Sequence, residues 1–293
     1  MLDTKLYTLL KVAEYRNFTQ AAKSLNLTQP AVSQHIHALE ADLGVKLFIR
    51  SGTRLNLTKE GEKAVTAARM IKNLYNNLKY DISEGAAKVK ELSIGITHTV
   101  ESNRISEILA KYATENNGMM IRLETGTQGG IIQKLKSYDL DLGIIDGAVN
   151  DADLETTRLD EDSLVLVMDP SHALAEKSSV SLDDIRSEKL ILRLPESGTG
   201  NLFISSVQSM GMDMSFFNVI LEIDNIATIK DLVRHGYGVS VLAKSACMDE
   251  IAKKKLIALP IRQLKMNREI NIVCARDFSY RNFISDIIQM YNS

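Results

Sequence analysis

The sequence predicts an α/β protein with a winged helix-turn-helix at its amino end, a long linker helix and a carboxyl-terminal region of alternating strands and helices. Three observations lead to this fold: closely spaced helix signals followed by two short strands, an apolar seam at coiled-coil spacing, and then a series of short apolar runs. The 293 residues exceed one ordinary small domain. We expect domain boundaries at residues 1–58, 59–85 and 91–293.

The composition describes a globular protein rather than a membrane protein. Hydrophobic residues make up 45% and charged residues 25%, and no stretch approaches the roughly 18 apolar residues of a membrane span. The amino end lacks an export leader, so we expect a cytoplasmic protein with no membrane partner. Cys247 and Cys274 lie outside any metal-ligand spacing. We therefore expect no metal, no disulfide and no cofactor, and a redox role for either thiol stays open.

Charge is divided unevenly along the chain. Residues 1–90 carry 14 Lys and Arg against 8 Asp and Glu, a net charge of +6, and residues 91–293 carry 21 against 29, a net charge of −8. A polyanion is attracted to the first region and repelled by the second. This suits nucleic-acid binding at the amino end, although ordinary surface solvation gives a similar imbalance.

The first helices are placed by their capping residues. Asp3 can cap a first helix and Thr19 a second, Gln20–Leu25. Thr28 can cap a third helix, in which Pro30 is tolerated because first-turn N–H groups have no acceptor within the helix. The short gap between the second and third helices is typical of a helix-turn-helix.

The third helix separates into an apolar and a polar face. The apolar positions, at helical spacing, are Val32, Ile36, Leu39 and Leu43. Amide and hydroxyl groups near the start of such a helix can reach base edges in the major groove of DNA. The polar face carries Gln29, Pro30, Ser33, Gln34 and His37.

A wing is predicted after the third helix. Val45–Leu57 contains two short strands around Ser51 and Gly52, and Arg50 and Arg54 flank the turn. Arginines at such a hairpin can contact backbone phosphates or a narrow minor groove. The alternative is a small helical domain that docks on a protein partner, with both arginines solvated.

The run NFTQAAKSLNLTQPAVSQHIHALEADLGVKLFIRSGTRLNLTKEG resembles the amino-terminal signature of LysR-type transcriptional regulators. The matching positions include Phe18, Ala21, Ala22, Leu25, Ala31, Glu40, Gly44, Leu47, Phe48, Leu57, Thr58 and Gly61. The resemblance implies base contacts by Gln29, Pro30 and Ser33. It implies phosphate contacts by Thr28 and Arg50, and a wing contact by Arg54. Gln34 replaces an arginine of many relatives, which favours adenine at that step.

The next helix carries the apolar seam. Thr58 can cap it, its end is expected at Gly85, and its intervals alternate four and three as in a coiled coil. The seam consists of Ala64, Ala68, Ile71, Tyr75, Leu78 and Ile82. It needs a partner helix, although it could instead dock on its own domain. The resemblance implies that this helix pairs two subunits, so we expect a homodimer or homotetramer on an inverted-repeat operator in double-stranded DNA.

Residues 91–293 alternate between apolar runs and helical stretches, mostly of ten residues or more. The runs are LSIGI, MMIRLET, DLGIID, LVLVMD, KLILRL, FNVILEI, GVSVLA and INIVCA. The resemblance implies the two-lobed fold of periplasmic binding proteins. Lobe I would comprise residues 91–162 and 268–293, and lobe II residues 163–267. A small-molecule effector would lie between the lobes.

Polar clusters follow three of the predicted strands, where ligands of such folds bind. They are Thr97, His98 and Thr99; Thr127 and Gln128; and Ser197, Gly198 and Thr199. Each cluster could instead only cap a helix. The run ESGTGN resembles a GSGTR element of one family branch, with Gly200 in place of its arginine, so a ligand-clamping cation is lost. Glu101 and Arg104 also depart from the family pattern, which suggests an unusual pocket charge. An anion is a candidate effector through likeness to that branch.

Enzyme signatures are missing from the sequence. GxSxG, HExxH, a Walker loop and a strand-linked GxGxxG do not occur. We therefore expect a DNA-binding transcriptional regulator controlled by a small-molecule effector, with RNA polymerase as a further candidate partner. The alternative is a small-molecule binding protein or enzyme whose amino-terminal region serves only dimerisation.

Overall fold

The computed structural model describes residues 3–51, 54–82, 91–102 and 104–293. The chain divides into two compact units, one formed mainly by residues 1–89 and the other mainly by residues 90–293. The predicted turn residue Gly52 and the predicted helix end at Gly85 lie outside the described residues. No helix in the described ranges is long and apolar enough to cross a membrane.

The first unit begins with three helices, α1 (Thr4–Tyr15), α2 (Phe18–Leu25) and α3 (Gln29–Leu43). The predicted caps at Asp3 and Thr28 are confirmed, with their side chains accepting from Lys5 N and Ala31 N. The predicted cap at Thr19 is wrong. Asn17 caps α2 instead, because its Oδ1 accepts from the N–H groups of Thr19 at 2.8 Å and of the next residue at 3.1 Å.

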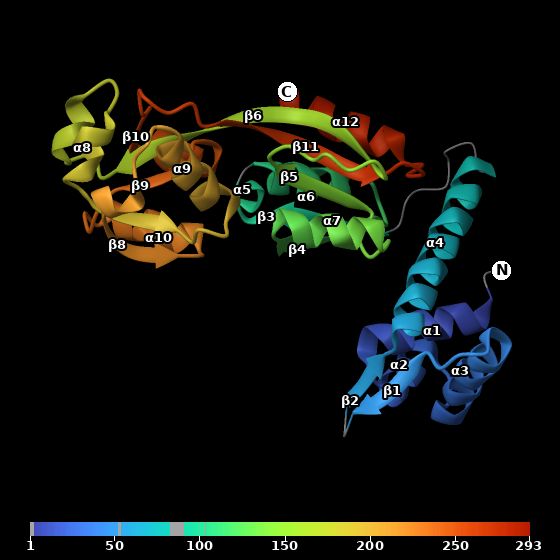
Figure 1. The fold of residues 1–293 in the computed structure, drawn as a ribbon. Coiled ribbons are helices and arrows are strands. Elements are labelled where there is room, and N and C mark those ends of the chain that lie inside the picture. Colours follow the sequence, from blue (N-terminus) through green and yellow to red (C-terminus); the bar gives the residue numbers. More distant parts are fainter. Residues whose placement is uncertain (1–2, 52–53, 83–90, 103) are drawn as a thin grey trace. The chain divides into compact units, whose positions relative to one another are not determined.

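Figure 1 shows the three helices gathered around the start of α4 (Lys59–Ile82), and the apolar core of this unit takes side chains from all four helices and from the wing region. Of the predicted apolar face of α3, Val32, Ile36 and Leu39 are buried. Leu43 is 52% exposed, so its predicted burial is wrong: it lies in the last turn of α3, just before the C-cap Gly44. The wing is confirmed as two antiparallel strands, β1 (Phe48–Ser51) and β2 (Arg54–Leu57).

The linker helix α4 spans Lys59–Ile82. The predicted cap is confirmed, because Thr58 Oγ1 accepts from Gly61 N at 2.8 Å. A Cβ atom at Gly61 would lie 2.0 Å from the carbonyl oxygen of Leu47, so glycine lets the start of α4 pass this close to the segment before the wing.

The first part of the predicted α4 seam is buried, and most of its second part is exposed. Ala68 is buried in the core of the first unit and Ala64 packs against that core, so this end of the seam docks on its own domain. Ile71, Leu78 and Ile82 are exposed by 43%, 53% and 74%. Tyr75 is half-buried. Met70 and Leu74 of α4 are exposed as well. We call the exposed apolar residues of this helix the α4 stripe; they are Met70, Ile71, Leu74, Leu78 and Ile82.

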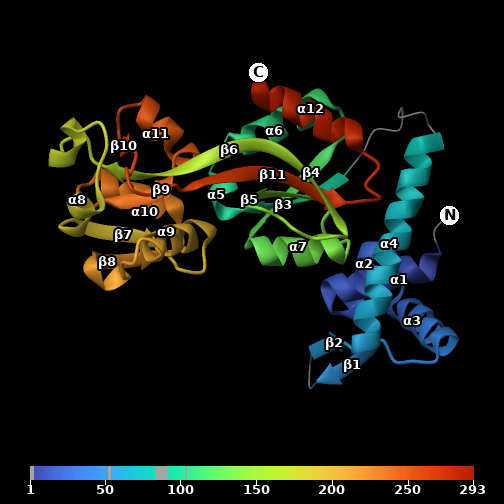
Figure 2. The same ribbon diagram turned by 45° about the horizontal axis from the view of Figure 1, so that its top comes forward.

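The second unit contains two α/β lobes. In the first lobe the strand order is β4-β3-β5-β11-β6, in which β6 spans Leu154–Met168 and β11 spans Asn267–Ala275. Strands β3, β4 and β5 are parallel, and β11 is antiparallel to both of its neighbours. Figure 2 shows α6 and α12 on one face of this sheet and α7 on the other. Its elements are β3 (Glu91–Thr97), α5 (His98–Glu101), α6 (Ile105–Glu115), β4 (Met120–Gly126), α7 (Gln128–Lys136), β5 (Leu142–Asp146) and α12 (Arg281–Asn292).

The second lobe encloses an extensive apolar core of its own. Parallel β7 and β8 join β9 through a bridge at Leu190 and Val239, and β9 and β10 flank the far half of β6. Its helices and strands are α8 (Leu182–Arg186), β7 (Lys189–Arg193), α9 (Gly198–Ser209), β8 (Asn218–Ile223), α10 (Ile226–Arg234), β9 (Ser240–Ala243), α11 (Met248–Ala252) and β10 (Ile257–Leu259). Three 3-10 turns lie at Ala173–Glu176, Met214–Phe216 and Ser245–Cys247.

Two long strands, β6 (Leu154–Met168) and β11 (Asn267–Ala275), run from one lobe into the other (Figure 2). All eight predicted apolar runs form strands, whereas β10 was not predicted. Several connecting helices are shorter than expected, with nine residues in α7 and α10 and four in α5. The two-lobed α/β fold is confirmed, and the residue-level domain boundaries stay predictions.

Candidate nucleic-acid interface and ligand cleft

The polar face of α3 is open. Gln29, Ser33 and Gln34 make no hydrogen bond or ion pair within the described residues, and only Ser33 is partly covered. Pro30 is exposed in the first turn. His37 is exposed and its Nδ1 lies 3.6 Å from a carboxylate oxygen one turn later. These donors and acceptors are therefore available to an external partner.

The wing of the same unit presents two cations. Arg50 lies in β1 and Arg54 begins β2. Both side chains are exposed, and neither forms an ion pair with any described residue. Unpaired guanidinium groups on a hairpin suit phosphate contacts.

A buried carboxylate holds α3 against the wing. Glu40 Oε1 accepts from Leu47 N at 2.9 Å, and Glu40 Oε2 accepts from Lys46 Nζ at 2.6 Å. Burial alone would raise the pKa of Glu40, but these bonds and one from Phe48 N lower it by more. In the middle of α3, His35 Nδ1 lies 2.9 Å from the hydroxyl of Thr8, which ties α3 to α1. Neither group was predicted as a positioning residue, because the partner of His35 is 27 residues away and the partners of Glu40 lie beyond the end of α3.

The second unit contains a cleft of about 590 Å³ between the lobes. Its walls are the carboxyl ends of β3, β4, β5 and β7, the start of α9 and the start of β11. All but one of the predicted effector residues line it along one edge or the other: Thr97, His98, Thr99, Thr127, Gln128, Ser197 and Gly198. Thr199 does not line this cleft. Its hydroxyl is buried, 3.3 Å from the hydroxyl of Thr99.

Two of these side chains cap helices as well as line the cleft. Thr127 Oγ1 accepts from Gly130 N at 3.2 Å at the start of α7. Ser197 Oγ accepts from Gly200 N at 3.0 Å and donates to Leu194 O at 2.7 Å. These hydroxyls line the cleft and cap helices at once, so their capacity for a ligand is reduced.

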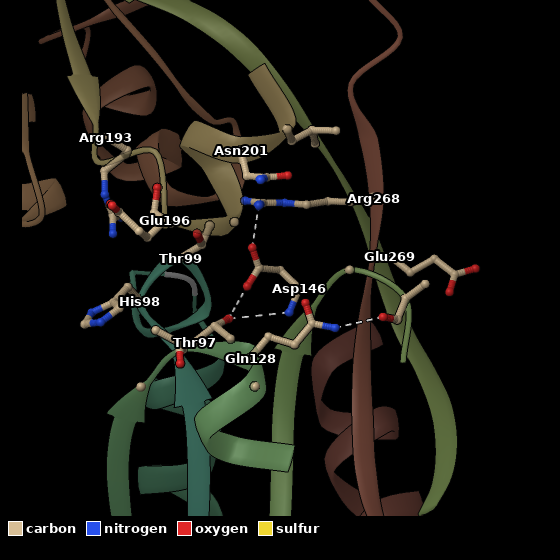
Figure 3. Close-up of a pocket in the computed structure, with 18 of the residues that line it drawn as sticks. Thr97, His98, Thr99, Gln128, Asp146, Arg193, Glu196, Asn201, Arg268 and Glu269 are labelled. Carbon is tan, nitrogen blue, oxygen red and sulfur yellow. Dashed lines mark hydrogen bonds and ion pairs between the residues drawn. The ribbon is translucent and has the colours of Figure 1, made fainter. Parts of the chain in front are cut away.

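An ionic cluster that the sequence did not predict crosses the cleft. Figure 3 shows Asp146, at the end of β5, between Arg268 of β11 and the hydroxyl of Thr97. Arg268 Nη2 also donates to Thr199 Oγ1 at 3.3 Å, so one guanidinium contacts both lobes. Asp146 is 6% and Arg268 8% exposed. Asp146 ends the apolar run DLGIID, so its place at a strand end could have marked it as a cleft residue. No pattern in the sequence around Arg268 indicated that this arginine would pair with it.

A second arginine of the cleft is less completely paired. Arg193 ends β7, and its Nη2 donates to Asp224 Oδ1 at 2.9 Å. Nε and Nη1 of Arg193 are buried and have no hydrogen-bond partner. Burial lowers the pKa of Arg193 while Asp224 opposes that shift, and a guanidinium stays charged at neutral pH. An unpaired buried donor costs about 1–3 kcal/mol, which makes this side chain conspicuous.

The departures from the family pattern have structural explanations. A Cβ atom at Gly200 would lie 2.3 Å from Leu194 O, so no side chain fits there without a shift. Gly200 supplies no cation, and the cations that line the cleft are Arg193 and Arg268 instead. Glu101 and Arg104 do not line the cleft, so they do not set the charge of its walls, and the Arg104 guanidinium lies 4.5 Å from the ring centre of Tyr291.

Two family models match nearly the whole chain. Residues 4–62 match "Bacterial regulatory helix-turn-helix protein, lysR family", and residues 86–291 match "LysR substrate binding domain". The chain belongs to the LysR family. As a LysR family protein it is a DNA-binding transcriptional regulator with an effector-binding domain, not an enzyme, as the sequence predicted.

Individual relatives agree with this LysR assignment. The transcriptional regulator CysL of Bacillus subtilis (strain 168) is 27% identical over 270 residues, covering 92% of this chain and 89% of CysL. A full-length variant of OxyR from Pseudomonas aeruginosa superposes with a TM-score of 0.78 at 21% identity, covering 100% of this chain and 95% of OxyR. Full-length CbnR complexed with its target DNA gives a TM-score of 0.64 at 20% identity, covering 100% and 99%.

Proposed function

We propose that this regulator reads an operator in double-stranded DNA with the amino-terminal half of α3, while the wing contacts the DNA backbone. The observation that carries the proposal is the open polar face of α3, where Gln29, Ser33 and Gln34 have no partner within the described residues. Amide groups can bond adenine edges, and hydroxyls can bond several bases. Thr28, Pro30 and His37 border this surface, and Arg50 and Arg54 supply phosphate contacts.

The regulator is proposed to act as a homodimer joined through α4. The exposed stripe includes Ile71, Leu74, Leu78 and Ile82, apolar side chains that a single chain leaves in water. Pairing of two such helices fixes the separation of two α3 helices, so the operator is expected to be an inverted repeat.

Assembly beyond the dimer has a separate candidate surface. The edge strands β4 and β8 expose Met120, Leu123, Ile220 and Leu221. Apolar edges of this kind are usually covered in an assembly, which supports a tetramer.

A cytoplasmic location is part of the proposal, because the regulator must reach its operator. RNA polymerase is a candidate partner that pull-down with the DNA-bound regulator can test.

The cleft is proposed to bind the small-molecule effector and to pass its state to the DNA-binding unit. Strands β6 and β11 are the long connections between the lobes, so a ligand that prefers one separation of the lobes shifts the population of that conformation. The family assignment disfavours the alternative in which the amino-terminal region only dimerises a binding protein or an enzyme.

A gel shift with the DNA upstream of the regulator's own gene tests the DNA-binding surface. Gln29→Ala and Ser33→Ala are compared with Gln208→Ala and Ser209→Ala, the same changes at exposed positions near the end of α9. We expect a loss of about 5- to 150-fold in specific affinity for the α3 variants, corresponding to about 1–3 kcal/mol, and no change for the controls.

Salt dependence separates base contacts from phosphate contacts. Arg50→Ala should reduce the slope of log K against log salt by about 1, whereas Gln29→Ala should leave that slope unchanged. Unchanged specific binding by both α3 variants would show that α3 does not read the operator.

A further inference from the structure

We infer that lobe II contains a second ligand site, separate from the cleft, which takes a small neutral ring compound with a hydroxyl group, such as a phenol. The site is a cavity of about 190 Å³. It lies between α9 and the strands β7, β8 and β9. Of the described residues that line the cleft, only Arg193 also lines this cavity.

Helix α9 presents different side chains to the two spaces. Asn201 and Leu202 line the cleft, whereas Phe203 and Ile204 line the cavity. A ligand in the cavity therefore contacts a part of α9 that a ligand in the cleft does not reach. For the same reason, a substitution on α9 can narrow one of the two spaces and leave the other open.

The walls of the cavity are mostly apolar. Leu192, Phe203 and Val241 are buried, and Ile204 and Val219 are half-buried. An apolar cavity of about 150 Å³ in another protein is large enough to bind benzene. The present volume of about 190 Å³ therefore accommodates a single aromatic ring with one small substituent. Burial of such a ring removes its apolar surface from water, which favours binding.

Two polar side chains interrupt these walls, and both have unused hydrogen-bonding groups. Nε and Nη1 of Arg193 are buried and have no hydrogen-bond partner. Glu222 also lines the cavity, and its side chain makes no hydrogen bond or ion pair with any described residue. A hydroxyl group accepts through its oxygen and donates its proton. One hydroxyl group on the ligand can therefore accept from Arg193 and donate to Glu222.

The charges around the cavity favour a neutral ligand. Nη2 of Arg193 donates to Asp224, so the guanidinium already has one carboxylate partner, and Glu222 adds a second carboxylate to the wall. These two carboxylates repel an anion, and the guanidinium repels a cation. A charged ligand would also lose its hydration among the apolar walls, at a much larger cost than a neutral one.

Isothermal titration calorimetry on the full-length protein tests the inference. Phenol is the probe, and toluene, in which a methyl group replaces the hydroxyl, is the matched control compound. We expect phenol to bind the wild type, and toluene to bind about five- to tenfold more weakly because it cannot hydrogen-bond to Arg193 or Glu222.

Three tryptophan substitutions locate the bound phenol. Ile204→Trp fills the cavity and should weaken phenol binding at least about tenfold. Leu202→Trp narrows the cleft instead, and Ile220→Trp places the same side chain at an exposed position that lines neither space. Both of these variants should bind phenol as the wild type does. Loss of phenol binding in Leu202→Trp would place the phenol in the cleft and overturn the inference.

A substitution at an exposed residue keeps the test decisive if Ile204→Trp does not fold. Glu222→Ala should weaken phenol binding at least about threefold and leave toluene binding unchanged. Glu176→Ala, at an exposed glutamate of lobe II that lines neither space, should change neither. The inference is overturned if phenol does not bind the wild type, if toluene binds as tightly as phenol, or if Ile204→Trp or Glu222→Ala binds phenol with wild-type affinity.

Discussion

Removal of the Glu40 carboxylate should loosen the wing from α3. Glu40 is 8% exposed and accepts from the backbone N–H of Leu47, a residue with no exposed surface, as well as from Lys46 Nζ. Glu40→Ala leaves the Leu47 N–H group buried without an acceptor. Glu40→Gln keeps an oxygen for Leu47 but places an amide group against the Lys46 ammonium.

The two substitutions should differ in magnitude. An unsatisfied buried N–H costs about 1–3 kcal/mol, so we expect about 2 kcal/mol of lost stability for Glu40→Ala. Lys46 is 68% exposed, so its ion pair contributes little, and Glu40→Gln should cost only about 0.5–1 kcal/mol. For a unit of this size, 2 kcal/mol lowers the midpoint of thermal unfolding by about 8–16 °C.

The pH dependence provides an independent check. The pKa of Glu40 lies below its ordinary value near 4.5, so the ionised carboxylate stabilises the folded state above that pH. This contribution is lost as pH falls through the lowered pKa. The stability difference between wild type and Glu40→Gln should therefore be constant above about pH 5.5 and shrink at lower pH.

Thermal unfolding followed by circular dichroism, together with DNA gel shifts, measures both effects. Glu14→Gln serves as the control, because the Glu14 carboxylate forms only a surface ion pair with Lys11 on α1. The reasoning about the wing would be refuted if Glu40→Ala unfolded at the wild-type temperature, or if the difference for Glu40→Gln grew as the pH was lowered.

Three further predictions concern other parts of the molecule. Leu78→Glu should weaken the dimer at least about tenfold in sedimentation equilibrium, while Lys72→Glu should not; an unchanged dimer would exclude the α4 stripe as the interface. Burial raises the pKa of Cys247 to about 12, so this thiol should react with Ellman's reagent only after unfolding, and rapid reaction of the native protein would contradict its burial. Asp146→Asn leaves the buried Arg268 guanidinium with only the more distant Asp162 carboxylate, 4.0 Å away, and should cost about 3 kcal/mol in urea unfolding; a loss below about 1 kcal/mol would mean that the Asp146–Arg268 pair does not hold the lobes.

Local chemistry explains why much of the fold could be predicted. The caps at Asp3, Thr28 and Thr58 depend on acceptors within three residues of the groups they bind. The eight strands follow from short apolar runs, and all the predicted cleft residues except Thr199 line the cleft because the strand ends of both lobes face it. The two errors also have local causes. Asn17, two residues before Thr19, is the residue that caps α2. The apolar spacing of α3 continues to Leu43, although that residue lies beyond the buried core.

The sequence by itself determined the strands, the exposed polar face of α3 and the polar edges of the cleft, since these follow from periodicity and neighbouring residues, while the LysR-type architecture followed from the resemblance of its amino-terminal signature. Only the tertiary structure decided that the seam of α4 is half buried, that Asp146 meets Arg268, and that Arg193 keeps unpaired donors. The physical reason is that burial and ion pairing depend on groups brought together from distant parts of the chain, and no local pattern specifies which groups will meet.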